Sequence, residues 1–123
     1  MIFLDTDICV YLFSGSKPKL NARVLAQDAG VLAVSAVTFA ELALGSNIGK
    51  PPPMSVLERF VSEVRLIDFD GAAARAYATL PFKRGSFDRL LAAHALSLDA
   101  LVVTNNPKHF DDVPGLKVEN WTV

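Results

Sequence analysis

The sequence predicts an α/β fold in which helices cover both faces of a mainly parallel sheet of four to five strands. Short apolar runs, typical of buried strands, alternate along the chain with segments whose apolar residues recur at helical spacing. Such alternation favours parallel strands joined by helices, and a parallel sheet needs helices on both faces. With 123 residues and no repeat or low-complexity linker, we expect one domain spanning residues 1–123.

The first half of the chain alternates strand and helix patterns. The second predicted helix places Leu20, Val24, Leu25 and Ala29 on one face and stops at Gly30, since glycine commonly ends helices. In order, the predicted elements are a strand over 1–5, helices over 6–13 and 19–30, a strand over 31–35 and a helix over 36–45.

The second half begins with a proline-rich loop. Pro51, Pro52 and Pro53 hold residues 46–54 out of a helix, and a second break covers 80–86. The remaining predicted elements are helices over 55–65, 71–80 and 86–99 and strands over 66–69 and 100–104, with 116–120 as a candidate fifth strand.

The composition indicates which partners and which cellular compartment to expect. A mean hydropathy of +0.33 is high for a monomer and suggests that a partner covers some apolar surface. The net charge of −1 gives no general attraction to nucleic acid or to an anionic membrane, so RNA binding would need a local basic patch. Cys9 is the only cysteine and no run approaches the ~20 apolar residues of a membrane span, so we expect a cytoplasmic protein without disulfides.

Polar residues gather at one edge of the predicted sheet. Asp5 closes the first strand, Glu41 lies early in the helix after the second strand, and Asp88 lies in the first turn of the helix that leads to the fourth. Thr104 and Asn106 follow the fourth strand directly. The carboxyl ends of parallel strands meet at one edge, where such folds bind ligands.

Three carboxylates at this edge suit a hard divalent cation. Without a cation they would repel one another, and oxygen ligands of this kind bind Mg²⁺ or Mn²⁺. A metal held there lowers the pKa of a bound water and stabilises the charge of a phosphate under attack. Asp5, Glu41 and Asp88 are therefore the candidate metal ligands and catalytic residues, and the hydrolysis of phosphodiesters is the chemistry that they suit.

Each acid also has a purely structural interpretation. Asp5 and Asp7 can cap the short helix that follows the first strand. Glu41 completes the spacing of a capping box with Thr38, unless Ser35 is the cap, in which case Glu41 is free to point into the crevice. Asp88 lies where the helix dipole favours an acid, so a capping role is open there as well.

Nearby basic residues and the histidines need separate interpretations. Lys83, Arg84 and Arg89 flank Asp88 and would supply positive charge for a phosphate backbone. His94 lies in an apolar helical run and is expected in the core or at an interface. His109 lies in a predicted loop, where both a structural and a functional role stay open.

Four separated segments carry a resemblance to a known family. FLDTDI, VSAVTFAELALG, FDRLLAAHAL and LVVTNNPKHFDDVPGLKVENW together resemble the PIN-domain ribonucleases and, more closely, the VapC toxins of toxin–antitoxin pairs. The segments occur in the family's order and span nearly the whole chain. The similarity is weakest over about residues 47–85.

The resemblance implies a three-layer α/β/α fold and Mg²⁺-dependent endonucleolytic cleavage of RNA, with Mn²⁺ as a candidate substitute and tRNA among the candidate substrates. It also implies a homodimer and a cognate VapB-like antitoxin that covers the site. The three acids of the family fall on Asp5, Glu41 and Asp88, and Thr104 matches the polar residue that closes the fourth strand.

Two positions depart from the family pattern. Many PIN domains carry a fourth acid where this chain has Asn106, which leaves a second metal with less support. Related chains more often have asparagine where this chain has Asp7, and that extra acid is expected to tune the metal site or to cap the helix. Asp111 or Asp112 is a further candidate to replace the missing acid.

Three other functional classes remain as alternatives. In a haloacid dehalogenase-like phosphatase, Asp5 would be the nucleophile and Asp7 the acid–base residue. A phospho-receiver domain would need Asp70 as the phosphate acceptor. A PIN-like module that only binds RNA or a protein is the third alternative.

Overall fold

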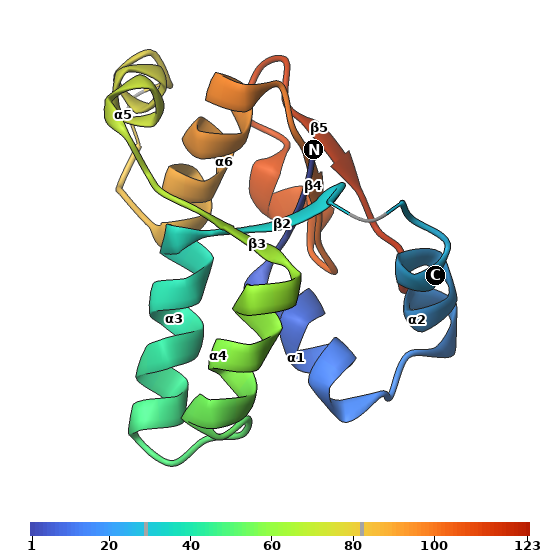
Figure 1. Cartoon of the computed structure of the whole chain (residues 1–123). Helices are drawn as coiled ribbons and strands as arrows, with labels where there is room; N and C mark the ends of the chain where they lie inside the picture. Colours follow the sequence, from blue (N-terminus) through green and yellow to red (C-terminus); the bar gives the residue numbers. More distant parts are fainter. Residues whose placement is uncertain (29, 82) are drawn as a thin grey trace.

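A single parallel sheet of five strands forms the centre of the molecule, with the order β3-β2-β1-β4-β5 (Figure 1). The computed structural model describes residues 1–28, 30–81 and 83–123. The strands are β1 (Ile2–Leu4), β2 (Leu32–Ser35), β3 (Arg65–Ile67), β4 (Leu101–Val103) and β5 (Lys117–Glu119). The predicted parallel sheet is confirmed, and the candidate fifth strand pairs with β4.

Six α-helices and one short 3₁₀ helix are present in the described part of the chain. They are α1 (Thr6–Ser14), α2 (Pro18–Leu25), α3 (Ala36–Asn47), α4 (Met54–Glu63), α5 (Gly71–Ala78), α6 (Phe87–Leu98) and the 3₁₀ helix η1 (Pro107–Phe110). The 3₁₀ helix was not predicted, because one turn that begins at a proline carries no periodic signal.

The predicted helix over 19–30 is too long at its carboxyl end. Leu20 is fully buried against the sheet, whereas Leu25 is 84% exposed, so the apolar face that predicted the helix does not continue into the core. The chain turns after α2 and enters β2, whose Leu32 must lie opposite Ile2 of β1. Ala29, the last member of the predicted face, lies outside the described residues.

Strand residues alternate between two cores, which confirms the three layers. Phe3, Ala33 and Val102 face one core, which α6 and η1 cover, and α5 packs against α6. Their neighbours Leu4 and Val34 face the other core, which lies beneath α1 to α4. Each face of the sheet therefore packs against its own helix layer. Segments from both layers meet at the carboxyl edge of the sheet.

The order of the strands reverses next to β1. From β1 the chain moves outward through β2 and β3, and it then returns to place β4 on the other side of β1. In open α/β sheets such a switch point opens a crevice at the carboxyl ends of the strands, and ligands bind there. The order also rules out the phospho-receiver alternative, since that fold has the order 2-1-3-4-5.

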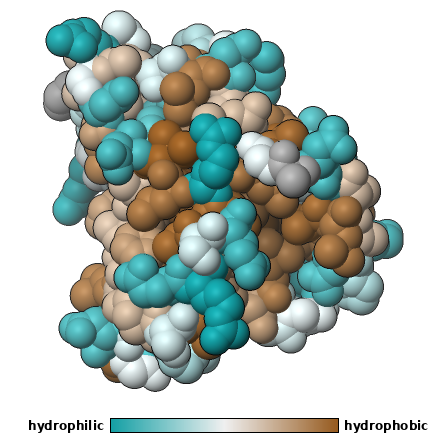
Figure 2. All heavy atoms as spheres, in the orientation of Figure 1, coloured by the Kyte–Doolittle hydropathy of each residue, from teal (hydrophilic) through white to brown (hydrophobic). Residues whose placement is uncertain are grey.

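Part of the apolar composition lies on the surface. Figure 2 shows brown hydrophobic residues over much of one face, interrupted by teal hydrophilic ones. At the carboxyl end of α3, Leu44 and Ile48 are 61% and 62% exposed. Within the described residues, no helix is both long enough and apolar enough to cross a membrane.

Candidate active site

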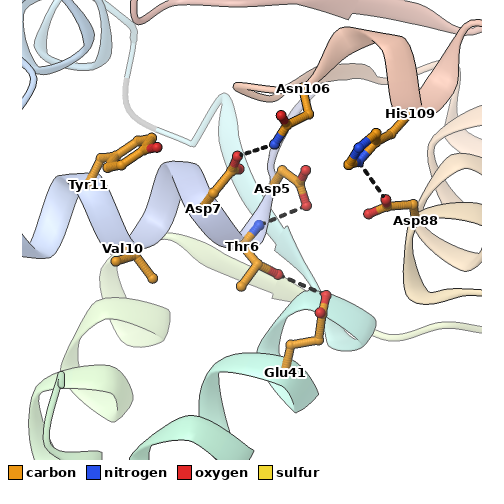
Figure 3. Close-up of a pocket in the computed structure, with 9 residues that line it drawn as sticks. All are labelled: Asp5, Thr6, Asp7, Val10, Tyr11, Glu41, Asp88, Asn106 and His109. Carbon is orange, nitrogen blue, oxygen red and sulfur yellow. Dashed lines mark hydrogen bonds and ion pairs between the residues drawn. The ribbon is translucent and has the colours of Figure 1, made fainter. Parts of the chain in front are cut away.

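A pocket of about 500 Å³ opens at the carboxyl edge of the sheet, at the switch point between β1 and β4 (Figure 3). Its walls come from α1, α3, α6 and the segment after β4. The lining residues are Asp5, Thr6, Asp7, Val10, Tyr11, Glu41, Asp88, Asn106 and His109. The three acids expected at this edge thus lie around one pocket.

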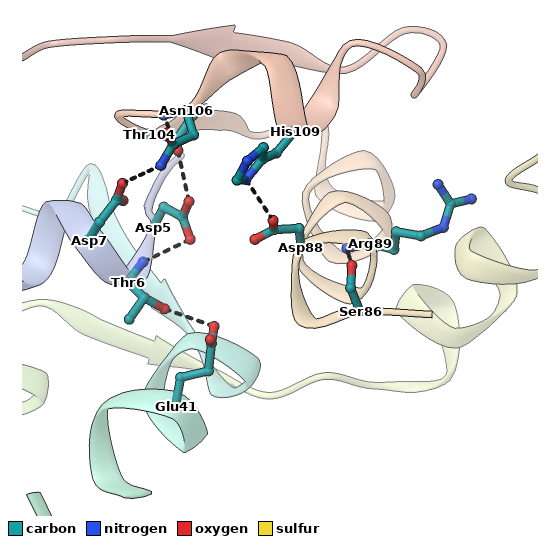
Figure 4. Close-up of polar contacts among 10 residues, drawn as sticks. All are labelled: Asp5, Thr6, Asp7, Glu41, Ser86, Asp88, Arg89, Thr104, Asn106 and His109. Carbon is teal, nitrogen blue, oxygen red and sulfur yellow. Dashed lines mark hydrogen bonds and ion pairs between the residues drawn. The ribbon is translucent and has the colours of Figure 1, made fainter. Parts of the chain in front are cut away.

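Asp5 lies between the ends of the two central strands. One carboxylate oxygen accepts a 2.8 Å hydrogen bond from the Thr6 amide, so Asp5 caps α1. The other oxygen accepts a 2.8 Å hydrogen bond from the Thr104 hydroxyl at the end of β4 (Figure 4). Burial of this side chain raises its pKa to about 6, against the lowering effect of these two hydrogen bonds, and nearby acids add to the rise. Helix capping therefore uses one oxygen of Asp5, while the hydrogen bond to the second oxygen links the end of β1 to the residue after β4.

Glu41 faces the pocket because it is not needed at the start of its helix. Ser35 caps α3 by accepting a 3.1 Å hydrogen bond from the Val37 amide, so the capping-box interpretation of Glu41 is wrong. Its carboxylate instead accepts a 2.9 Å hydrogen bond from the Thr6 hydroxyl of α1. Burial of the side chain raises the pKa of Glu41 above its usual range.

Asp88 reaches the pocket from the opposite side, in the first turn of α6. Ser86 caps this helix through the Arg89 amide, so Asp88 is not needed as the cap. Asp88 Oδ2 lies 3.1 Å from Nδ1 of His109 in η1 (Figure 4). This contact resolves the open interpretation of His109, which lies at the pocket and holds one of its acids.

Asp7 and Asn106 meet across the mouth of the pocket. The side-chain amide of Asn106 donates a 3.0 Å hydrogen bond to Oδ2 of Asp7, and the Ile8 amide donates a 2.9 Å bond to Oδ1. The Asn106 backbone amide in turn donates to the Thr104 hydroxyl at 3.1 Å. Partial burial raises the pKa of Asp7. Asp7 and Asn106, the two residues that depart from the family pattern, thus contact each other directly.

The donor set of this pocket fits an oxygen-preferring divalent metal. Four carboxylates and one amide line it, and such ligands suit Mg²⁺ or Mn²⁺. Among the residues that the structure describes, no three His, Cys, Asp or Glu side chains are close enough to form a complete cage for an ion. A divalent ion bound here would therefore be held directly by one or two of the carboxylates and would reach the others through its waters.

The expectation that Arg89 contributes free positive charge is corrected by the structure. Arg89 is 6% exposed, and its guanidinium donates to Asp112 at 3.2 Å and to the Pro81 carbonyl. Lys83 pairs with the same Asp112 carboxylate at 2.9 Å. Asp112 is thereby bound in ion pairs, which lower its pKa, and it does not replace a fourth acid in the pocket.

A second hollow of about 310 Å³ adjoins the acidic pocket, and Asp88 and His109 line both. Its wall also includes Lys83 and Lys108. Arg84 is exposed in the loop before α6. The basic residues of this hollow are therefore Lys108 together with Lys83 and Arg89, and the last two both pair with Asp112.

His94 belongs to the core, as expected, and so does Cys9. His94 is 1% exposed, its Nδ1 lies 2.8 Å from the Ser35 hydroxyl, and its ring packs against Phe3 and Phe69. Burial lowers the pKa of His94 and raises that of the Cys9 thiol. Cys9 is fully buried and is inert as a nucleophile.

Sequence reasoning missed Thr6, Tyr11 and Lys108 as parts of these two hollows. Thr6 had a signal, because a hydroxyl directly after Asp5 begins the helix that faces the crevice. Lys108 follows the fourth strand by a few residues and lies in η1, which begins directly after Asn106. Tyr11 had no signal, since an aromatic residue within a helix is more often a core residue.

The chain is similar to known proteins over nearly its whole length. The profile of the family described as PIN domain matches residues 2–116. The chain is 32% identical over 128 residues to the tRNA(fMet)-specific endonuclease VapC of Shigella flexneri, covering 97% of this chain and 96% of that protein. It is 34% identical over 129 residues to Ribonuclease VapC2 of Rickettsia felis, covering 96% of each. Among solved structures, VapBC2 from Rickettsia felis bound to a DNA fragment from its promoter gives a TM-score of 0.82 at 34% identity, covering 98% of this chain and 99% of that chain.

Proposed function

Because this chain belongs to the PIN-domain family, and its curated relatives are VapC ribonucleases, we propose that it is an endoribonuclease that acts as the toxin of a toxin–antitoxin pair. The observation that carries this proposal is the meeting of Asp5, Glu41 and Asp88 around one pocket at the switch point of the sheet. These residues come from the end of β1, from α3 and from α6, and only the folded chain brings them together.

We assign the three acids to a divalent metal, with Mg²⁺ as the ion and Mn²⁺ as a substitute. When bound there, the metal supplies an activated water and stabilises charge on the phosphate under attack. Hydrogen bonds from neighbouring side chains hold each acid in place: Thr104 orients Asp5, Thr6 orients Glu41, and His109 orients Asp88. Such contacts behind the ligands fix their direction, which a metal site requires.

RNA is the substrate that the surroundings of the pocket favour, and tRNA is our candidate because one relative is a tRNA(fMet)-specific endonuclease. Lys108 and Lys83 line the hollow beside the acidic pocket, where the lysines can contact phosphates of a bound RNA. Repulsion between the acids and the RNA backbone falls once a metal is bound, so metal binding precedes productive RNA binding.

A VapB-like antitoxin is the partner that we propose, since the similar solved structures are VapBC complexes. We further propose a homodimer and the cytoplasm as the compartment, where RNA substrates are found. The exposed apolar residues Leu44 and Ile48 supply surface that such partners would cover.

The phosphatase alternative loses its support. The family model that matches residues 2–116 is that of the PIN domain. In the pocket, both oxygens of Asp5 already accept hydrogen bonds from Thr6 and Thr104, which suits a fixed ligand better than an attacking nucleophile. A module that only binds RNA remains the alternative that the experiment must separate from the nuclease.

The test is a cleavage assay on a pool of structured RNAs, tRNA among them, and unstructured RNAs, with Mg²⁺, Mn²⁺ or EDTA. Asp5→Asn and Asp88→Asn are compared with the parent protein, and Asp111→Asn, which changes an exposed acid outside the pocket, is the control. We expect metal-dependent endonucleolytic cuts by the parent and the control, and none by the two site variants. RNA binding without cleavage under every metal condition would favour the binding module.

A further inference from the structure

We propose that a third hollow, between the end of α5 and the start of α6, binds an unpaired base of the substrate RNA and that Tyr77 is the surface on which this base stacks. The proposal rests on the proposed function, because it takes RNA as the substrate. The hollow has a volume of about 330 Å³, which is within the range of small-ligand sites. Its described lining residues are Tyr77, Ala78, Leu80, Pro81, Lys83 and Arg89.

The third hollow is linked to the acidic pocket through the second hollow. Asp88 and His109 line both the acidic pocket and the second hollow, while Lys83 and Arg89 line both the second and the third. The helices α5 and α6 pack side by side (Figure 1). Figure 4 shows that Asp88 points toward the other acids, whereas its neighbour Arg89 points the opposite way. The three hollows therefore follow one another around the start of α6, and a strand of RNA can run along them from the acids.

Tyr77 supplies an aromatic surface that the fold itself does not use. It is half-buried near the end of α5, and it belongs to neither of the two cores in the described part of the chain. Aromatic side chains stack on the unpaired bases of single-stranded RNA, since every base has a flat π face. Leu80 and Pro81 add apolar wall to the same hollow. A base that stacks on Tyr77 is thus also removed from water by these two residues.

The charges beside Tyr77 favour a ligand that carries phosphates. None of the described residues that line the third hollow is acidic, and Lys83 and Arg89 are basic. Both pair with Asp112, and Arg89 also donates to the Pro81 carbonyl. A lysine has three N–H donors and an arginine has five, so each keeps donors for a phosphate or for the edge of a base. Lys108 adds positive charge in the second hollow. A phosphate in the second hollow and a base in the third would match the alternation of charge and flat surface along an RNA strand.

The experiment compares binding of one short RNA of mixed sequence as a single strand and annealed to its complement, because only the single strand offers unpaired bases. All proteins carry Asp5→Asn, so that the RNA stays intact, and binding is followed by fluorescence anisotropy in Mg²⁺. We expect Tyr77→Leu, which removes the ring, to weaken binding of the single strand roughly 5- to 100-fold and to leave binding of the duplex unchanged. Tyr77→Phe is the matched control, which keeps the ring and should bind both RNAs as the parent does. Lys108→Gln should weaken binding of both forms to a similar extent, because a contact to phosphate does not require an unpaired base.

Ala78 offers a second test that leaves the ring in place. It is exposed and lines the third hollow, so a substitution there does not disturb a core. Ala78→Glu adds a carboxylate to the hollow, and we expect it to bind the single strand roughly 5-fold more weakly than Ala78→Gln, which has the same size without the charge. Thermal unfolding of each variant shows that it is folded.

Three results would overturn the inference. Tyr77→Leu that binds the single strand like the parent would show that no base stacks on this ring. An equal loss with the duplex would show that the contact is not with an unpaired base. Equal affinities of Ala78→Glu and Ala78→Gln would show that RNA stays out of the third hollow. The proposed function fails separately, if the protein without Asp5→Asn cleaves none of the pooled RNAs under any metal condition.

Discussion

The substitution Asp5→Asn should make the metal-free protein more stable at neutral pH, even though it is expected to abolish cleavage. Folding buries Asp5 and raises its pKa from 3.8 to about 6. The folded protein therefore binds this proton more tightly than the unfolded chain does. Below about pH 4 the carboxyl is neutral in both states and costs nothing, whereas above about pH 6 the folded state bears the full cost of a buried charge.

The size of the effect follows from that shift. A rise of about 2 pKa units corresponds to roughly 3 kcal/mol at neutral pH. Asparagine can still accept from the Thr6 amide, but its NH₂ group then faces the Thr104 hydroxyl, which loses its acceptor. That loss costs about 1 kcal/mol. The net gain is roughly 2 kcal/mol, or a rise of about 5–10 °C in Tm for a chain of this size.

The assay is thermal or urea unfolding of both proteins in EDTA between pH 4 and pH 8. We expect the advantage of Asp5→Asn to appear as the pH rises from 4 to 6 and to stay constant above that range. Millimolar Mg²⁺ should then stabilise the parent and not the variant, so the gap narrows. An Asp5→Asn protein that is no more stable than the parent at pH 7.5, or whose advantage grows toward acid pH, would refute this reasoning.

Three further substitutions test the other assignments. Glu41→Gln keeps its contact with α1, so we expect cleavage of RNA to fall at least about 100-fold while the unfolding midpoint in EDTA stays equal or rises slightly. Ser35→Ala removes both the cap of α3 and the partner of His94, and it should cost about 1–3 kcal/mol in urea unfolding; an unchanged midpoint would contradict both roles. Arg89→Met breaks a largely buried ion pair and should cost about 2–4 kcal/mol, whereas Arg84→Met, at an exposed position, should change stability by less than about 0.5 kcal/mol.

Much of the fold followed from local patterns. The strands β1, β2 and β4 are short runs of mainly apolar residues whose alternate members face the two helix layers, and that pattern is readable in the sequence. The edge of the sheet that carries Asp5, Glu41 and Asp88 followed from a single rule, that parallel strands end on the same side. The position of β4 beside β1 did not follow, because strand order depends on packing between distant segments.

The polar contacts of the site could not be predicted from the sequence, for a different reason. Asp7 and Asn106 are 99 residues apart, and no local signal links them. Arg89 carries a charge that usually stays on the surface, and it is buried only because Asp112 and the Pro81 carbonyl satisfy its donors. Such compensation depends on side-chain placement in three dimensions, which periodicity does not encode.

The central position of β1 has a consequence for the synthesis of the protein on the ribosome. β1 is made before β2 and β3, yet its neighbour β4 (Leu101–Val103) is made only after both of them. A nascent chain that has not yet released β4 lacks the Thr104 hydroxyl that orients Asp5, and it leaves one side of β1 unpaired. The pocket is therefore incomplete until β4 and Thr104 have been made, which gives an antitoxin made at the same time the opportunity to meet the toxin as it folds.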